Sequence, residues 1–173
     1  MSTAAFIETN VGKSFRVQDA EGRQAGKALA PFLLALATYC SANNVSTEIQ
    51  RWFSKLQAQS VEPASFCALA KAFYSGDWNY SEDEYNEFVR NSPGLPLSHD
   101  EFVKTLRQVA QIWVDIESLH SIVNEFIRLL QEIRLESALW YDPQWTLLNF
   151  QALSQTLSKA REHGANRVRI KFV

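Results

Sequence analysis

The sequence predicts a mainly α-helical protein, an elongated multi-helix bundle around one long helix at about residues 98–140. A small β-sheet, built from an N-terminal hairpin and the C-terminal strand, is expected beside the bundle. Apolar residues repeat every seven positions from Phe102 to Leu130, with polar residues opposite, as in an amphipathic helix. The last residues instead alternate between apolar and basic, as in a strand with one buried face.

Length and composition predict one folded unit. The 173 residues are 46% hydrophobic and include 11 Phe, 5 Trp and 5 Tyr, which is ample for a packed core. We therefore expect a single helical domain over residues 1–173. The formal net charge of -2 gives no overall attraction to nucleic acid or to an anionic membrane, although residues 159–173 carry five basic side chains and one acidic one.

Two cysteines and one apolar run bear on the cellular compartment. Cys40 and Cys67 each lie in an apolar helical pattern, which favours buried reduced thiols, with a disulfide between them as the alternative. The apolar run at residues 28–40 contains Pro31 and is shorter than the roughly 20 residues that a membrane span needs. We expect a cytoplasmic protein with no membrane partner.

The N-terminal segment is expected to form a hairpin and then a helix. Residues 4–8 and 14–18 are β-prone and flank a loop of turn-forming residues. The first helix is predicted at residues 19–42. Pro31 lacks a backbone donor and should kink this helix or split it in two.

Three shorter helices are predicted next. A capping box begins the second helix at Thr47, and Pro63 stands in the first turn of the third, which Gly76 ends. A second capping box begins a short helix at Ser81. The proline-rich segment at residues 92–97 then forms a turn.

The long helix begins at Ser98, whose side chain caps it, and should end near residue 140. A straight helix of that length would extend about 63 Å, whereas a compact chain of this size is about 40 Å across. The helix must therefore bend, lengthen the molecule or pack against a second chain. We expect an elongated bundle, with a homodimer favoured over a monomer.

A last helix and a strand complete the chain. Asp142 is expected to cap the helix, with Pro143 in its first turn and Gly164 at its end. Trp145 begins its apolar face. Residues 166–173 alternate strictly and need the N-terminal hairpin as a partner, so the two chain ends should meet in one sheet.

Two groups of residues are candidates for a binding surface. Arg167, Arg169 and Lys171 would form one charged row on the terminal strand, able to contact phosphates or an acidic protein. Trp78 and Tyr80 lie in an aromatic loop of the kind found at interfaces. A solvated sheet face and a loop folded over the core are the simpler explanations.

His120 interrupts the apolar stripe of the long helix. It lies at a core position of the heptad pattern, where a histidine must be hydrogen-bonded. We expect a polar core residue of the helix seam. A role in setting the register of the packed helices and a response to pH are the sharper alternatives.

No reaction chemistry is predicted. Gly12-Lys13-Ser14 resembles the end of a phosphate-binding loop, but Ile7 stands where that loop requires glycine. Glu117 and His120 form one Glu-x-x-His motif, whereas a carboxylate-bridged metal site uses two such motifs and further glutamates. We expect no catalytic residues, no metal and no cofactor.

The expected function is that of a non-enzymatic intracellular interaction or assembly protein, an adaptor or regulator, with a protein partner or itself as partner. One alternative is a nucleic-acid-associated protein that uses the basic C-terminal strand. The other is a metal-dependent helical-bundle enzyme centred on Glu117 and His120. A three-histidine site from His99, His120 and His163 would require the helices to converge.

Overall fold

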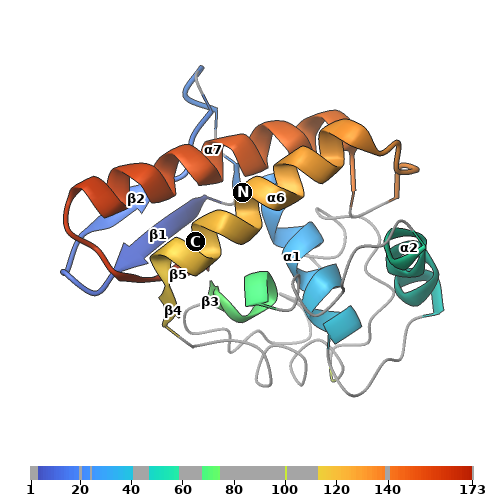
Figure 1. The fold of residues 1–173 in the computed structure, drawn as a ribbon, viewed down its shortest axis with the longest axis horizontal. Coiled ribbons are helices and arrows are strands. Elements are labelled where there is room, and N and C mark those ends of the chain that lie inside the picture. The colour runs from blue at the N-terminus through green and yellow to red at the C-terminus, as the bar shows by residue number, and fades with distance from the viewer. Residues whose placement is uncertain are drawn as a thin grey trace.

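The computed structural model describes residues 4–19, 21–23, 25–40, 47–58, 68–74, 100, 113–138 and 141–172. They form a mixed α/β fold in which helices pack against a five-stranded sheet (Figure 1). The predicted mainly α-helical bundle around one long helix is therefore wrong. Among the described residues, no helix has both the length and the apolar character needed to cross a bilayer.

The last strand of the chain is the central strand of the sheet. The strands are β1 (Ala5–Thr9), β2 (Ser14–Arg16), β3 (Phe73–Tyr74), β4 (Val114–Asp115) and β5 (Arg167–Phe172). One edge of β5 pairs antiparallel with β1, which pairs in turn with β2. Along its other edge, β5 pairs with two short strands that lie one after the other. β3 is parallel to β5, and β4 is antiparallel to it.

The predicted pairing of the N-terminal hairpin with the C-terminal strand is confirmed. Ala5 lies opposite Phe172, and Thr9 lies opposite Val168. The hairpin turns at Gly12, whose φ of +76° is a left-handed conformation that glycine adopts without strain. The two ends of the described chain therefore lie side by side, as the alternation in the sequence indicates.

The helices with bounds in the described part of the chain are α1 (Gly26–Cys40), α2 (Thr47–Gln57), α6 (Ile116–Glu132) and α7 (Pro143–Glu162). Of these, α1, α6 and α7 contact the sheet, and α2 packs against α1. The expected cap and end of α7 are confirmed, because Asp142 accepts a hydrogen bond from the Trp145 amide and Gly164 has φ of +86°. The helix expected to begin at residue 19 begins at Gly26 instead, and it runs through Pro31 without a break.

Within residues 98–140, where one long helix is predicted, the described residues depart from helix in two places. Residues 114–115 form β4, and α6 begins only at Ile116. At the other end, Ile133 has extended backbone angles, and the indole of Trp52 donates to the Glu136 carbonyl at 3.0 Å. A tertiary contact thus holds an extended segment where the heptad pattern predicts helix. Residues 101–112 of the predicted helix lie outside the described residues.

The third helix of the prediction is also corrected. Residues 68–71 are helical, but residues 73–74 form β3, since their backbone pairs with β5. The expected start at Pro63, the stop at Gly76 and the short helix at Ser81 lie outside the described residues.

An aromatic cluster joins the helices over the inner face of the sheet. Phe32 on α1 lies at its centre, with ring centroids 5.3 Å from Phe126 and 5.5 Å from Phe150. The inner sheet residues Ile7 and Ile170 are fully buried in the same core. The prediction of a single domain over residues 1–173 remains a prediction.

Cys40, at the end of α1, is disulfide-bonded, so the prediction of a reduced thiol there is wrong. The sequence contains one other cysteine, Cys67, which lies outside the described residues.

Candidate functional site

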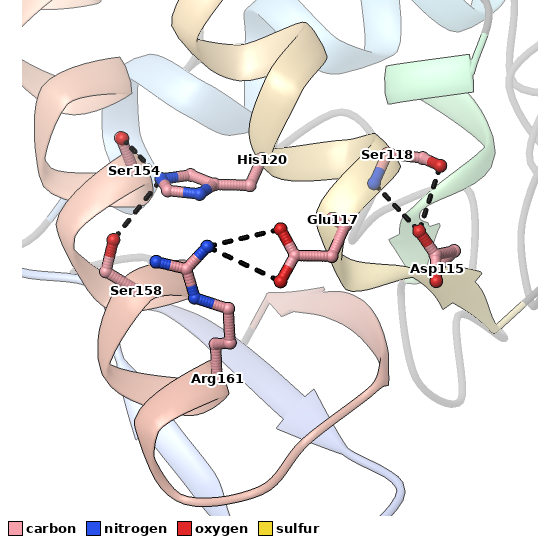
Figure 2. Close-up of polar contacts among 7 residues, drawn as sticks. All are labelled: Asp115, Glu117, Ser118, His120, Ser154, Ser158 and Arg161. Atoms are coloured by element: carbon pink, nitrogen blue, oxygen red, sulfur yellow. Dashed lines mark hydrogen bonds and ion pairs between the residues drawn. The ribbon is translucent and has the colours of Figure 1, made fainter.

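A polar cluster lies along the seam between α6 and α7 (Figure 2). Near the start of α6, Glu117 meets Arg161 near the end of α7. One turn further along α6, His120 meets Ser158 and Ser154. The two helices therefore pack antiparallel, and the spacing of three or four residues on each places these side chains on facing surfaces.

The hydrogen bonds of the cluster have a defined direction. The hydroxyl of Ser154 donates to Oδ1 of Asn124 at 2.6 Å, and a hydroxyl has only one proton. The Ser154 oxygen must therefore accept from Nε2 of His120, which lies 3.0 Å away. His120 is a donor here and does not withdraw the serine proton, so Ser154 lacks the activation that nucleophilic catalysis needs.

His120 is half-buried in this seam, where it was predicted to be a polar core residue. Partial burial lowers the pKa of its imidazole below the usual 6.5, and the nearby positive charge of Arg161 lowers this pKa further. The carboxylate of Glu117 and the contact with Ser154 act in the opposite direction. His120 is therefore uncharged at neutral pH.

The geometry does not favour a metal site at the Glu-x-x-His motif. Both carboxylate oxygens of Glu117 lie within 3.4 Å of Nη1 of Arg161, whereas Nε2 of His120 faces the serines. The His163 ring lies tilted against Phe15, with ring centroids 5.1 Å apart, and His99 lies outside the described residues. Within the described ranges, no group of three or more metal-ligating side chains converges.

Asp115 is explained by its place at the start of α6. Its carboxylate accepts hydrogen bonds from the backbone and the hydroxyl of Ser118, which hold the pKa of Asp115 below its usual range (Figure 2). The positive charge of Arg167, opposite it on β5, adds to this effect. The carboxylate thus caps the helix and balances one residue of the predicted basic row.

The predicted basic row lies on the side of the sheet opposite the helix-packed core. We call this side the outer sheet face and define it by six residues that the strand register and ring contacts place together: Phe6, Arg16, Trp113, Arg167, Arg169 and Lys171.

Two of the three predicted cations have partners on this face. Arg169 donates to Glu8 at 2.6 Å and its guanidinium lies 4.5 Å from the Trp113 ring centroid, while Nζ of Lys171 lies 3.7 Å from Glu8. Arg167 is exposed beside Asp115. The other predicted binding residues, Trp78 and Tyr80, lie outside the described residues.

A third feature, the pair formed by Trp145 and Arg23, was missed by the sequence reasoning. Trp145 is 47% exposed in the first turn of α7, and the guanidinium of Arg23 lies 5.1 Å from its ring centroid. The prediction placed Trp145 on the buried face of this helix. The spacing of the buried residues could have shown that Trp145 is exposed. The buried stripe of α7 starts at Thr146 and repeats through Asn149 and Leu153, so Trp145 lies one residue before the stripe.

No protein-family model, curated protein or solved structure matches this chain. Function must therefore be inferred from local arrangements of the described residues, of which three have been presented. The helix seam is a closed hydrogen-bond network without an activated nucleophile, the outer sheet face combines cations with aromatic rings, and the Trp145–Arg23 pair presents a large aromatic side chain to solvent.

Proposed function

We propose that this protein is a non-enzymatic interaction or assembly protein that binds a protein partner through the Trp145–Arg23 pair. The exposed position of Trp145 carries the proposal. Tryptophan and arginine are the residue types most enriched among those that dominate binding at protein interfaces. By contrast, Trp52 is only 6% exposed and belongs to the core.

The pair is held in place before any partner arrives. Asp19 accepts from Nε of Arg23 at 2.6 Å and from the backbone amides of Glu21 and Arg23, which fixes the turn that carries the arginine. Glu21 lies 3.1 Å from Nη1 of the same guanidinium. Side chains that are already ordered lose less conformational entropy on binding, which supports a role in recognition.

A partner protein is favoured over self-association. The expectation of a homodimer came from the length of a helix at about residues 98–140. Since α6 ends at Glu132 and its apolar side chains pack into the core of the same chain, its length no longer calls for a second copy. The cross-linking experiment described below distinguishes a second copy of this chain from a different protein.

The cytoplasmic location that the sequence favours is not carried into this proposal. The sequence favours a cytoplasmic protein without a membrane partner, and in the described residues no helix has the length and apolarity of a span. The disulfide at Cys40 argues against the reducing cytoplasm, because such bonds persist mainly in oxidising compartments.

Site-specific photo-cross-linking tests the proposed surface. A photoreactive phenylalanine analogue replaces Gln144, beside the pair, or Gln131, an exposed position on α6. We expect a covalent protein adduct from position 144 that disappears when Trp145→Ala is added. Val11→Ala is the matched control, since Val11 is an exposed apolar residue elsewhere.

The mass of the adduct identifies the partner class. An adduct with the mass of two chains would show self-association through this surface. Equal adducts from positions 144 and 131, or a yield unaffected by Trp145→Ala, would contradict the proposal.

A further inference from the structure

We propose that the outer sheet face binds single-stranded nucleic acid, with cations contacting phosphates and bases stacking on Phe6 and Trp113. This inference concerns a different surface from the Trp145–Arg23 pair and a different class of partner. It therefore extends the proposed function and does not depend on it.

The strand register places aromatic and basic groups on one surface. Phe6 on β1 lies opposite Arg16 on β2 and opposite Lys171 on β5. Trp113 precedes β4 along the far edge of β5, where its ring meets Arg169. The described helices in contact with the sheet contribute to the core on the other side, so these groups do not serve the core.

The rings are spaced to serve separate bases. β5 lies between the strand that carries Phe6 and the edge that carries Trp113. Two strand spacings of about 4.8 Å separate the two backbones by about 10 Å across the sheet, and the register offsets Phe6 from Trp113 along β5. Separate aromatic positions suit the unstacked bases of a single strand, which stack on aromatic rings.

Arginines lie over both aromatic rings. The guanidinium of Arg16 is 5.9 Å from the Phe6 ring centroid, and that of Arg169 is 4.5 Å from the Trp113 ring centroid. Glu8 fixes the orientation of Arg169 by accepting from its Nε at 2.6 Å. The ordered arginine therefore keeps its positive charge beside Trp113, close to where the phosphates of a stacked strand would lie.

The charge of this face has the sign that a phosphate backbone requires. Among the described residues, this face carries four cations and two carboxylates, an excess of two positive charges: Arg16, Arg167, Arg169 and Lys171 against Glu8 and Asp115. The whole chain has a net charge of -2. The rest of the molecule therefore carries -4, which directs a polyanion toward this face.

The same features disfavour duplex DNA. Sequence reading in the major groove uses a helix or a two-stranded ribbon that enters the groove, and this face is the broad side of a sheet. An excess of two charges is also small beside the six to ten phosphate contacts of strong duplex binders. A short single strand that gains stacking energy suits this surface better.

Fluorescence anisotropy of a labelled oligouridine or oligothymidine tests the proposal with the full-length protein. We expect binding at low salt that weakens as salt rises, with a slope of about -2 in log affinity against log salt if about three phosphates are contacted. Arg16→Ala/Arg167→Ala should reduce the magnitude of this slope by about 1.4. Trp113→Leu should weaken binding about 5- to 100-fold, whereas Trp113→Phe retains most of it.

Matched controls separate this face from general charge effects. Arg51→Ala/Arg128→Ala removes two exposed helical cations and should leave binding unchanged. Circular dichroism confirms that each variant is folded. No anisotropy change at low salt, or equal losses in the two arginine double variants, would overturn the proposal. Binding of polyglutamate without oligonucleotide binding would identify an acidic protein as the ligand and would also overturn it.

Discussion

At the scale of single residues, His120 shows how the polar seam responds to its surroundings. Its Nε2 donates to Ser154, and Arg161 adds a positive charge nearby. Both partial burial and that charge oppose protonation of the ring, so the pKa of His120 is lower in the folded chain than in the unfolded one. Protonation therefore costs more when α6 and α7 are packed together.

This difference predicts a dependence of stability on pH. Because the folded pKa is below the unfolded value of 6.5, the unfolded chain binds more protons as pH falls through 6.5, and the free energy of unfolding decreases. Above pH 6.5 this loss disappears. Urea unfolding at neutral and mildly acidic pH should show a smaller pH effect in His120→Gln, which keeps a hydrogen-bond donor but does not titrate in this range.

Gln155→Ala is the control for that measurement, because it changes an exposed residue of α7 that does not titrate. It should leave the pH effect as it is in the original protein. An unchanged pH effect in His120→Gln would assign the dependence to other groups.

At the scale of elements, local chemistry could be predicted where it acts within a few residues. Asp142 as a cap, Pro143 in the first turn and the alternating terminal strand all satisfy rules of short range. The end of α6 could not be predicted in this way. Residues 133–142 include no glycine or proline that would end the helix. The extended backbone after α6 is held by the distant Trp52.

The start of α6 did have a local signal that the heptad pattern obscured. Trp113 and Val114 favour strands, and Asp115 is a good helix cap, with Ser118 positioned to donate to it. The apolar repeat continues through Ile116, so periodicity alone does not reveal the boundary. Pairing with β5, more than fifty residues later in the chain, makes the segment a strand.

The cap of α7 gives a second prediction. Replacing Asp142 with Ala removes the acceptor for the Trp145 amide and should lower the free energy of unfolding by about 1 kcal/mol. Asp142→Asn keeps an acceptor oxygen at the cap and should lose much less. Urea unfolding at neutral pH measures both variants, and equal losses in the two would show that the cap bond is not the cause.

At the scale of the whole molecule, the sheet brings together residues whose association the sequence indicates only in part. The row of Arg167, Arg169 and Lys171 follows from strand alternation. The addition of Phe6 and Trp113 to the same face requires the order and register of the strands, which depend on contacts between distant segments. The Trp145–Arg23 pair likewise requires the placement of a turn against a helix.

The disulfide at Cys40 gives a third prediction at this scale. The unfolded, unreduced protein should contain no thiol that reacts with a chromogenic disulfide reagent, and reduction should release two. Removing the bond should lower the free energy of unfolding by about 2–4 kcal/mol, because the unfolded chain gains freedom. Urea unfolding with and without reductant measures the loss, and two reactive thiols before reduction would contradict the bond.

The central position of β5 has a consequence for how the chain acquires its structure. During synthesis, β1 to β4 leave the ribosome before β5, which pairs with β1, β3 and β4. Until β5 has been made, β1 and β2 are the only two of these strands that can pair with each other. Closing contacts across more than 150 residues is slow, and edges left open in the meantime favour aggregation. The newly made chain therefore depends on β5 to complete the sheet, and conditions that shield exposed strands during synthesis should improve its yield.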